Sequence, residues 1–499
     1  MDVDLIMAVD VIRVPPLESS PPDLHRQRVR AVAVAGLITF AFAIWLGLEA
    51  PQGILSGTDE LLTAERTREM LLTNPWVVHY NFERSFEKPP LQYWLTSVTL
   101  PRLQNRAVAV RVWPLLYGVL TAIALGWLVR LVEPDQPWLI PLAVAILLSA
   151  PLFSTESARG LLDIGLTFFT VSTIVFAELA RKKPAWWLAV AAACLLGSLQ
   201  KIPLPFLVWA LIVLVRLLSR DERIALRKGI GWLIGSMLLA LAAMSIWPLL
   251  QLVKYEMPAW NLFHEEVVVW LGPNELGRRP YFEIPIRMSL TGGLCGFLSL
   301  IALFVILFSR KERPAPAVRE IALVTLAFLV LAIVSNFRHI RYAIPVVPSL
   351  CLLLALVFYR FLRQRPPIRT RAIIALVILL TAGFVHAKIQ IDQRRRDVAN
   401  EKVIAEKLGE LQQAGTETVL IKAIISGNDL TWDSFYLFHG NFRFPVARYT
   451  VDEIRREPRK PPVIGACIAR DFPVIKQLYP NVQVQLTRAQ FICWKVPAE

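Results

Sequence analysis

Acidic and basic residues stand beside the ends of long apolar runs in this sequence, where they could carry out acid–base or phosphate chemistry. Asp59 and Glu60 follow the first apolar run, and Glu87-Lys88-Pro89-Pro90 comes later in the same polar segment. A carboxylate can take a proton from a hydroxyl group. Lysine and arginine can hold a phosphate, the arginine fork with two hydrogen bonds. The segment therefore carries the residue types needed for proton abstraction beside a bound phosphate.

The composition indicates a polytopic membrane protein rather than a soluble one. The 499 residues are 55% hydrophobic and only 19% charged, and the mean hydropathy is +0.50. Apolar runs bounded by charged residues predict about eleven membrane-spanning helices, with a range of about 11 to 13. These runs lie near residues 31–50, 107–131, 137–153, 161–180, 185–200, 203–219, 230–250, 286–309, 319–336, 341–362 and 372–390.

The net charge of +15 has two interpretations, and the positions of the basic residues favour one of them. In a soluble chain a basic excess suggests nucleic acid, whereas in a membrane protein it marks the cytoplasmic loops. The densest basic clusters fall in alternate loops, so we expect no nucleic-acid partner, a cytoplasmic N-terminus and an extracytoplasmic loop 51–106. These clusters are 181–183, 216–228, 310–313 and 360–371.

The sequence divides into a tail, a membrane domain and a C-terminal domain. Residues 1–30 form a cytoplasmic tail, and residues 31–390 form the membrane domain with its polar loop 51–106. Residues 391–499 alternate β-rich runs with turn residues, which predicts a small soluble extracytoplasmic α/β domain. Its predicted strands cover 418–425, 463–468, 482–486 and 491–496, with a helix near 472–478.

Two short helices are expected within the polar loop. Asp59 to Leu72 is one, with Thr58 as its N-terminal cap. The other contains Leu91, Trp94, Leu95 and Val98 at helical spacing, which is typical of an amphipathic helix lying in the membrane interface with Tyr93 and Trp94 at headgroup depth.

Cysteine usage shows no zinc or redox motif. Cys194, Cys295 and Cys351 lie in apolar runs and are best interpreted as small packing residues. Cys467 and Cys493 lie in the C-terminal domain, where the sequence leaves open whether they pair or stay free.

Each residue of the polar loop also has a plainer structural explanation. Asp59 and Glu60 could only favour a helix N-terminus through the macrodipole. Glu87 and Lys88 could form a surface ion pair of little value, and Pro89-Pro90 could simply begin a helix.

The ionisable residues at the other span ends have similar alternatives. Asp163 needs a partner when buried, and Arg159 one turn earlier is the expected one. Lys201 could only be extending its ammonium toward the interface. His264 could join Glu87 in holding a divalent cation, or be solvated. Charges at span ends mark a functional site by default, and the same end of the membrane domain should also hold Glu156, Glu265, Glu266, Arg338, His339 and Arg341.

The order of these motifs resembles the membrane glycosyltransferases of the C superfold that use polyprenyl-phosphate sugars, in particular the bacterial aminoarabinose transferases and protein O-mannosyltransferases. The Phe-Glu-Lys-Pro-Pro-Leu stretch is the most specific part, and the resemblance covers about residues 30 to 362. The residues that carry it are Asp59-Glu60, Phe86 to Leu91 with Tyr93-Trp94-Leu95, Ala158-Arg159 with Leu162-Asp163, Lys201, and Arg341-Tyr342 with Pro345.

The resemblance implies transfer of a sugar from a polyprenyl (undecaprenyl) phosphate to a hydroxyl or phosphate acceptor at the outer membrane face, with inversion. Asp59 would be the general base, with Glu60 and Asp163 beside it in the catalytic set. Substrate would be bound by Glu87, Lys88, Arg159, Lys201, Arg341 and Tyr342. The acceptor could be a lipid, a protein or a polysaccharide, no cofactor is certain, and a divalent cation on Glu87 and His264 is one alternative.

Two other functions stay open at this point. A lipid-linked oligosaccharide ligase would need larger extracytoplasmic loops than this chain shows. A lipid or sugar transporter would carry ionisable residues at mid-membrane and an internal repeat, whereas the charges here cluster at one face and no convincing repeat is visible.

The predicted orientation can be tested by cysteine labelling in whole cells. A membrane-impermeant maleimide should label Gln104→Cys in loop 51–106 but not Lys182→Cys in a basic loop, because the positive-inside rule places them on opposite sides. Labelling of Lys182→Cys alone would reverse the orientation and remove the loop from the outer face.

Overall fold

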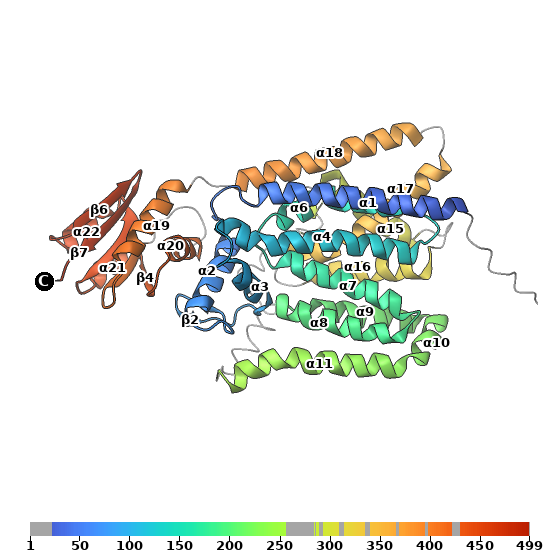
Figure 1. Ribbon diagram of the computed structural model, residues 1–499, viewed down its shortest axis with the longest axis horizontal. Helices are drawn as coiled ribbons and strands as arrows, with labels where there is room; N and C mark the ends of the chain where they lie inside the picture. The colour runs from blue at the N-terminus through green and yellow to red at the C-terminus, as the bar shows by residue number, and fades with distance from the viewer. Residues whose placement is uncertain are drawn as a thin grey trace, which may run out of the picture.

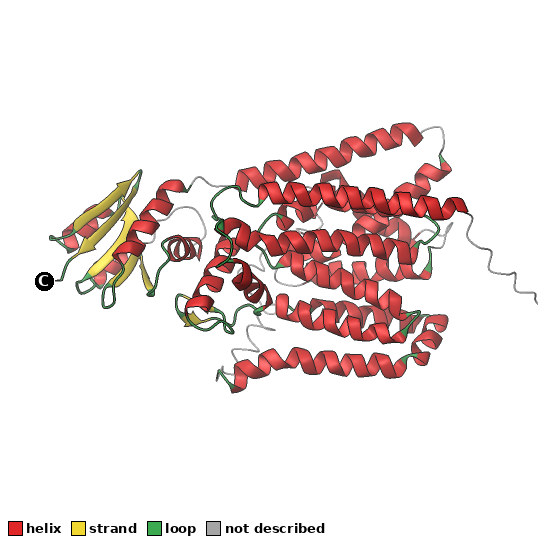
Figure 2. Ribbon diagram, viewed as in Figure 1, coloured by secondary structure: helices red, strands yellow, loops and turns green. Residues whose placement is uncertain are grey.

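The computed structural model describes residues 22–255, 284, 286–288, 293–308, 314–334, 340–365, 369–394, 398–421 and 430–498. Helices lie side by side in a bundle, and a small domain containing a β-sheet stands at one end of that bundle (Figures 1 and 2). The predicted fold class, a mainly α membrane protein with a small C-terminal α/β domain, is confirmed.

Seven helices in the described part of the chain are long and apolar enough to cross a membrane. They are α1 (Pro22–Glu49), α4 (Arg106–Val132), α7 (Asp163–Ala180), α11 (Ile230–Val253), α16 (Pro316–Val334), α17 (Val347–Gln364) with the preceding 3-10 helix η4 (Ile340–Val346), and α18 (Arg369–Arg394). Shorter apolar helices complete the bundle: η1 (Pro184–Trp186) with α8 (Trp187–Gln200), α9 (Leu204–Leu218) and α15 (Gly293–Phe308), while α10 (Arg220–Lys228) is a polar connection.

One predicted span is broken. α5 (Leu139–Ser149) and α6 (Pro151–Ser157) meet at an angle of 71°. Ala150 has an extended backbone, because a proline follows it and disfavours the helical conformation there. Each range predicted as a span contains a described helix or such a pair, and the number of membrane crossings stays a prediction.

A buried network of charges holds three spans together at the end of the bundle far from the C-terminal domain. Arg216 on α9 lies 2.9 Å from both Glu178 on α7 and Glu320 on α16, and all three side chains are at most 5% exposed. Arg181 adds a 2.6 Å contact to Glu320. Because each buried charge has an opposite partner, the network links the helices without leaving an unpaired ion in the apolar layer.

The polar loop forms the two expected helices, α2 (Thr58–Leu72) and α3 (Leu91–Thr99). Thr58 was expected to cap α2, but that prediction is wrong, since Gly57 has the extended backbone of the N-cap residue. α3 begins after Pro90, as the proline pair indicates. Tyr93 is 1% exposed, and its hydroxyl accepts a hydrogen bond from Arg66 at 3.3 Å. The depth of Tyr93 and Trp94 in the membrane stays a prediction.

The C-terminal domain contains a mixed sheet in the order β4-β3-β5-β7-β6. β3 is parallel to β4 and β5, whereas β7 is antiparallel to β5 and β6. The predicted strands and helix are confirmed within the described residues, while α20, α21 and the short β4 were not predicted. The elements are α19 (Ala399–Leu411), β3 (Glu417–Ile421), α20 (Leu430–His439), β4 (Val446–Tyr449), α21 (Val451–Arg456), β5 (Val463–Ile468), α22 (Phe472–Leu478), β6 (Gln483–Arg488) and β7 (Phe491–Val496).

The two cysteines of this domain are free. Ala466 pairs with Cys493 across the sheet, so the neighbouring Cys467 points to the opposite face. Cys493 and Cys467 accordingly belong to different apolar clusters. The sheet itself therefore keeps the two thiols apart.

The C-terminal domain binds the polar loop directly (Figure 1). Arg68 on α2 donates to the carbonyl of Phe442 at 2.6 Å. Asn81 forms two hydrogen bonds with the backbone of Val446, at 2.8 and 3.0 Å. The loop is thus fixed by the domain on one side and by the membrane bundle on the other.

Asn81 also belongs to the turn between β1 (His79–Tyr80) and β2 (Glu83–Arg84). Asn81 and Phe82 have φ values of 54° and 65°, a left-handed conformation that is costly for a bulky residue. The carboxylate of Glu69 accepts both of their backbone N–H groups, at 2.9 and 2.8 Å. Burial, followed by the neighbouring Glu65 carboxylate, raises the pKa of Glu69 to about 8.

The raised pKa of Glu69 predicts how stability changes with pH. The folded state binds the Glu69 proton more tightly than the unfolded state does. Its contribution to the free energy of unfolding is therefore complete below pH 4.5 and is lost as pH rises through about 8. Glu69→Gln keeps a neutral side chain at every pH and should flatten the fall in Tm between these values. Glu83→Gln, an exposed carboxylate on β2, is the control. Equal slopes in all three proteins would contradict the prediction.

Candidate active site

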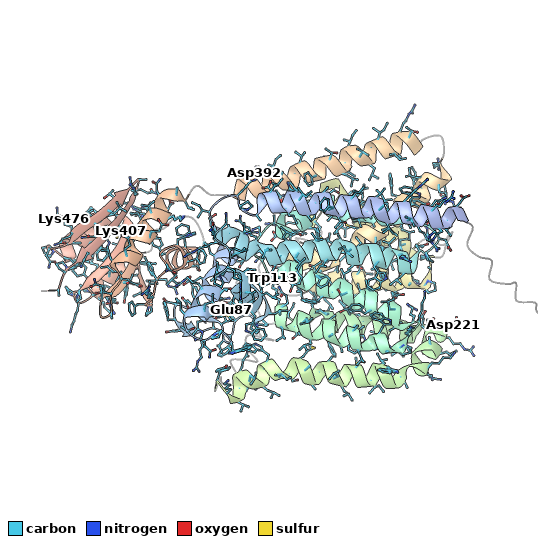
Figure 3. The ribbon with its side chains drawn as sticks, viewed as in Figure 1. Glu87, Trp113, Asp221, Asp392, Lys407 and Lys476 are labelled. Atoms are coloured by element: carbon cyan, nitrogen blue, oxygen red, sulfur yellow. The ribbon has the colours of Figure 1, made fainter. Side chains whose placement is uncertain are left out.

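The candidate site lies where five separate parts of the chain meet, at the end of the bundle that faces the C-terminal domain. α2 brings Asp59 and Glu60 in its first turn, and the turn between α6 and α7 brings Arg159 and Asp163. Lys201 stands at the end of α8, and Arg341 and Tyr342 lie in η4. Glu87 and Lys88 lie in the stretch before α3. Figure 3 places Glu87 at this junction and Asp221 at the opposite end of the bundle.

Asp59 forms an ion pair with Arg341. The Asp59 side chain is 42% exposed and that of Arg341 is 23% exposed, so the pair stands at an accessible surface. Burial acts to raise the pKa of Asp59, but the charge and hydrogen bond of Arg341, with Lys201 and Arg159 further away, outweigh it and hold this pKa below its usual range. Asp59 is therefore an ionised carboxylate surrounded by cations.

Asp163 binds Lys201 rather than Arg159, so the predicted pairing is wrong. Lys201 Nζ lies 2.5 Å from the Asp163 carboxylate, and both side chains are at most 7% exposed. The turn before α7 directs Arg159 back to Glu156, with its guanidinium 3.4 Å from that carboxylate. The Lys201 ammonium also lies 4.9 Å from the ring centroid of Tyr342. Because the Lys201 ammonium is buried and paired with Asp163, the alternative that it only extends toward the membrane interface does not apply.

Arg159 nevertheless stands at the site. A Cβ atom placed on Gly57, just before α2, would be 3.0 Å from the Arg159 guanidinium. Arg159 therefore lies against the start of the helix that carries Asp59. Tyr342 in turn interacts electrostatically with Lys88, Asp163 and Asp59. The cations Lys88, Arg159, Lys201 and Arg341 are thus brought together as the sequence predicted.

Glu60 points away from this cation cluster and into the bundle. Its two oxygens accept from Arg111 on α4, at 2.7 and 3.0 Å, and one of them also accepts the backbone N–H of Gly160 at 3.0 Å. Arg111 further donates to the carbonyls of Ala50 and Gln52, at 2.9 and 2.7 Å. A catalytic role for Glu60 stays a prediction, and its observed contacts position α2 against α1, α4 and the turn that carries Arg159.

Glu87 holds two basic side chains. It pairs with Arg66 on α2, whose side chain is only 5% exposed, and with Lys88 at 3.3 Å. Burial acts to raise the pKa of Glu87, but these two cations outweigh it and lower that pKa. Glu87 therefore connects α2 with the stretch that carries Lys88.

The described residues around Glu87 do not fit a metal ion. Both of its oxygens already contact cationic groups. The described part of the chain contains no group of three or more His, Cys, Asp and Glu residues arranged for a metal. His264, with Glu265, Glu266, Arg338 and His339, lies outside the described residues. A metal at this position stays a prediction.

Arg66 and Arg111 were missed by the sequence analysis. Arg66 follows Asp59 by seven residues, which is the spacing of one helix face, and that signal could have identified it. Arg111 stands within a predicted span, where a charge by itself indicates a buried partner. Its partner, however, comes from a distant part of the sequence, and no local pattern identifies Glu60.

Known proteins resemble this chain in part of its sequence and in its fold. Residues 62–263 match the family model of dolichyl-phosphate-mannose-protein mannosyltransferases. Over 178 residues the chain is 31% identical to undecaprenyl phosphate-alpha-4-amino-4-deoxy-L-arabinose arabinosyl transferase from Edwardsiella ictaluri, a match covering 34% of this chain and 32% of that protein. The matched part thus spans about a third of the relative's length.

Solved structures match over nearly the whole chain. ArnT from Cupriavidus metallidurans, bound to undecaprenyl phosphate, has a TM-score of 0.69 at 17% identity, covering 93% of this chain and 97% of that one. The Archaeoglobus fulgidus oligosaccharyltransferase has a TM-score of 0.62 at 13% identity, covering 84% and 64%. The chain therefore has the C superfold of membrane glycosyltransferases, and its predicted resemblance to the enzymes that use polyprenyl-phosphate sugars is confirmed.

The Glu60–Arg111 pair predicts a large effect on stability. Glu60→Gln leaves Arg111 buried without its charge partner, which should destabilise the protein by about 3–5 kcal/mol. The double variant Glu60→Gln/Arg111→Met should recover part of this loss, because no uncompensated charge remains. Thermal unfolding measures both changes, with Glu410→Gln as the control at an exposed pair expected to cost at most about 1 kcal/mol. A double variant no more stable than Glu60→Gln would contradict this explanation.

Proposed function

We propose that the protein transfers a sugar from a polyprenyl-phosphate donor to a hydroxyl or phosphate group of an acceptor, at the outer membrane face and with inversion at the anomeric carbon. The observation that carries this proposal is the partly exposed Asp59 carboxylate beside Arg341, Lys201 and Arg159. It supplies a base and a set of cations for a phosphate in one place, on the fold of the polyprenyl-phosphate-sugar transferases.

With a hydroxyl acceptor, the reaction needs one proton acceptor and a stabilised leaving group. The acceptor oxygen attacks the anomeric carbon while Asp59 takes its proton. The bond between that carbon and the phosphate oxygen breaks, and the electron pair leaves with the lipid phosphate. Lys88, Arg159, Lys201 and Arg341 offset the charge that grows on this phosphate. Attack from the side opposite the phosphate inverts the anomeric configuration.

Arg341 can link the two halves of this reaction. Its guanidinium pairs with Asp59, and an arginine fork binds phosphate oxygens as readily as carboxylate oxygens. The growing phosphate charge would draw Arg341 away from Asp59. Because Arg341 is the main cationic influence lowering the pKa of Asp59, its withdrawal makes the carboxylate a stronger base as the proton is transferred.

The remaining site residues position these groups. Asp163 holds the Lys201 ammonium at 2.5 Å, and the Tyr342 ring limits where that ammonium can move. Glu87 holds Lys88 at 3.3 Å while Arg66 fixes Glu87 to α2. Fixed cations cost little reorganisation when the phosphate charge develops.

The donor and the side of the membrane follow from separate observations. The name of the Edwardsiella ictaluri relative includes undecaprenyl phosphate, and ArnT from Cupriavidus metallidurans was solved bound to it, so this carrier lipid is the first donor to test. The basic clusters 181–183 and 360–371 support the outer face, because the positive-inside rule assigns them to the cytoplasm and Arg181 and Arg360 lie at the other ends of their spans from the site. The acceptor, whether a lipid, a protein or a polysaccharide, is to be identified by mass spectrometry of envelope lipids and proteins with and without the gene.

Asp59→Asn tests the proposed base. The amide keeps the shape of the side chain but cannot take a proton, so turnover of a radiolabelled undecaprenyl-phosphate sugar should fall by about a hundredfold to ten-thousandfold. Binding of the donor should be retained, because the cations are unchanged. Asp221→Asn, at an exposed carboxylate on the far end of the bundle, should have normal turnover.

The same assay separates the alternatives. A near-normal rate for Asp59→Asn would remove Asp59 from the base role. Consumption of oligosaccharide donors but not of single-sugar donors would instead indicate a ligase. Movement of the labelled lipid across the membrane of a vesicle without loss of its sugar would indicate a transporter.

A further inference from the structure

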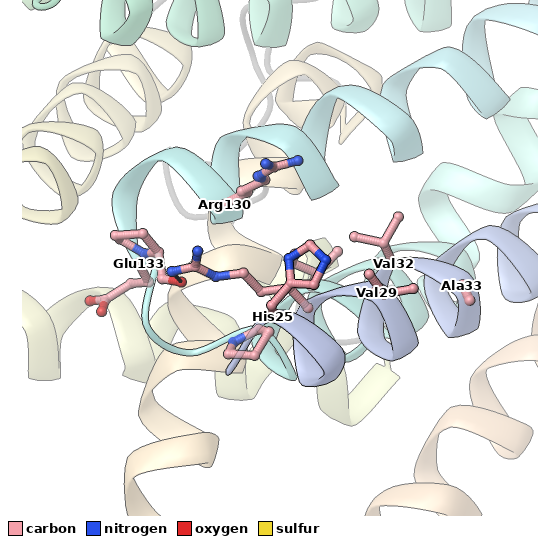
Figure 4. Close-up of a pocket in the computed structure, with 10 residues that line it drawn as sticks. His25, Val29, Val32, Ala33, Arg130 and Glu133 are labelled. Atoms are coloured by element: carbon pink, nitrogen blue, oxygen red, sulfur yellow. Dashed lines mark hydrogen bonds between the residues drawn. The ribbon is translucent and has the colours of Figure 1, made fainter. Parts of the chain in front are cut away.

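A cavity opens at the end of the bundle opposite the candidate site. It has a volume of about 510 Å³ and lies between the start of α1, the end of α4 and the turn before α5 (Figure 4). His25, Arg28, Arg130 and Glu133 provide its polar lining. Arg28 stands 21 residues before Glu49, the last residue of α1, so this cavity and the loop that carries Asp59 are about 30 Å apart along the helix axis.

The cavity continues into an apolar groove along the same helices. The groove has a volume of about 520 Å³ and shares Val32, Arg130 and Ile140 with the cavity. Gly36 and other small residues of α1 and α4 leave room between the helices. Phe40 on α1 is 64% exposed, so the groove is open to the hydrocarbon layer. The two spaces together combine a basic end with an apolar channel.

The charges at the basic end favour an anion. Among the described residues, no carboxylate forms an ion pair with Arg130, while Arg28 contacts the highly exposed Asp135 at 3.5 Å. Glu133 also lines the cavity and pairs with Arg360 at 3.7 Å. Three arginines, Arg28, Arg130 and Arg360, thus stand against two carboxylates, Glu133 and Asp135, which leaves this end with a positive excess. A basic cluster immediately beside a membrane span attracts anionic lipid headgroups.

We propose that this cavity and groove bind one anionic phospholipid of the surrounding membrane, with its phosphate on Arg28 and Arg130 and one acyl chain along Gly36 and Phe40. A soluble anion would use only the basic end and would not account for the apolar channel that continues from it. The site is independent of sugar transfer, because it lies a full span away from Asp59. The bound lipid fills the space between α1 and α4 and fixes the first span against the bundle.

Native mass spectrometry of the full chain tests the proposal, with phosphatidylglycerol and phosphatidylcholine of equal chain length as probes. The wild-type protein should retain phosphatidylglycerol in preference. Arg28→Gln/Arg130→Gln should weaken phosphatidylglycerol binding by about tenfold to thirtyfold, because two cations that hold its phosphate are lost. Phosphatidylcholine should lose less, because its choline cation already offsets the charge of its phosphate. Gly36→Leu should weaken the binding of both lipids, since a Cβ at Gly36 meets no atom within 4 Å and the leucine extends into the groove.

Matched controls come from α10 and α11, which lie at the same end of the bundle (Figure 1). Arg227→Gln removes an exposed cation, and Gly231→Leu fills a position that also meets no atom within 4 Å. Neither should change lipid retention. Equal retention of the two lipids by the wild-type protein, or equal losses in controls and test variants, would overturn the proposal. Displacement of phosphatidylglycerol by undecaprenyl phosphate would also overturn it, by assigning the groove to the carrier lipid.

Discussion

The buried ion pair between Glu60 and Arg111 determines where the polar loop meets the apolar bundle. Adjacent residues on a helix point about 100° apart, so Asp59 and Glu60 cannot face the same partner. Glu60 turns inward to Arg111 and Gly160, and Asp59 is thereby directed outward to Arg341. The pair of acidic residues thus divides two tasks: one anchors the helix, and the other is presented to the surface.

The ion pair that carries the proposed base differs in exposure from the charge network at the other end of the bundle. The network of Arg216, Glu178 and Glu320 is at most 5% exposed, and each charge there has an opposite partner. At the other end Asp59 is 42% exposed and Arg341 23% exposed. Water or substrate can compete for the second pair, whereas nothing can reach the first. A charge within an apolar run indicates either kind of site, and only the fold distinguishes them.

The sequence predicted the helices and the cations that gather near Asp59, but not Arg66, Arg111 or the pairings between these residues. Apolar runs predict spans because their length and composition are local properties. Asp163 was assigned to Arg159 by helical spacing, yet residues 158–162 are not helical, so that spacing does not apply, and Asp163 pairs with Lys201. Tyr93 is buried against Arg66, a contact that the amphipathic pattern of α3 does not predict. Contacts between distant segments decided each of these cases.

The position of Asp59 depends on the C-terminal domain as well as on the membrane bundle. The charged residues of α2 are buried by ion pairs and hydrogen bonds rather than by apolar packing: Arg66 binds Glu87, and Arg68 binds both Glu65 and the carbonyl of Phe442. A polar helix in water gains little from such contacts unless other segments exclude the water around them. The domain supplies that exclusion on one side, and the bundle supplies it on the other. Separating the two would leave α2, and the carboxylate at its start, without a fixed orientation.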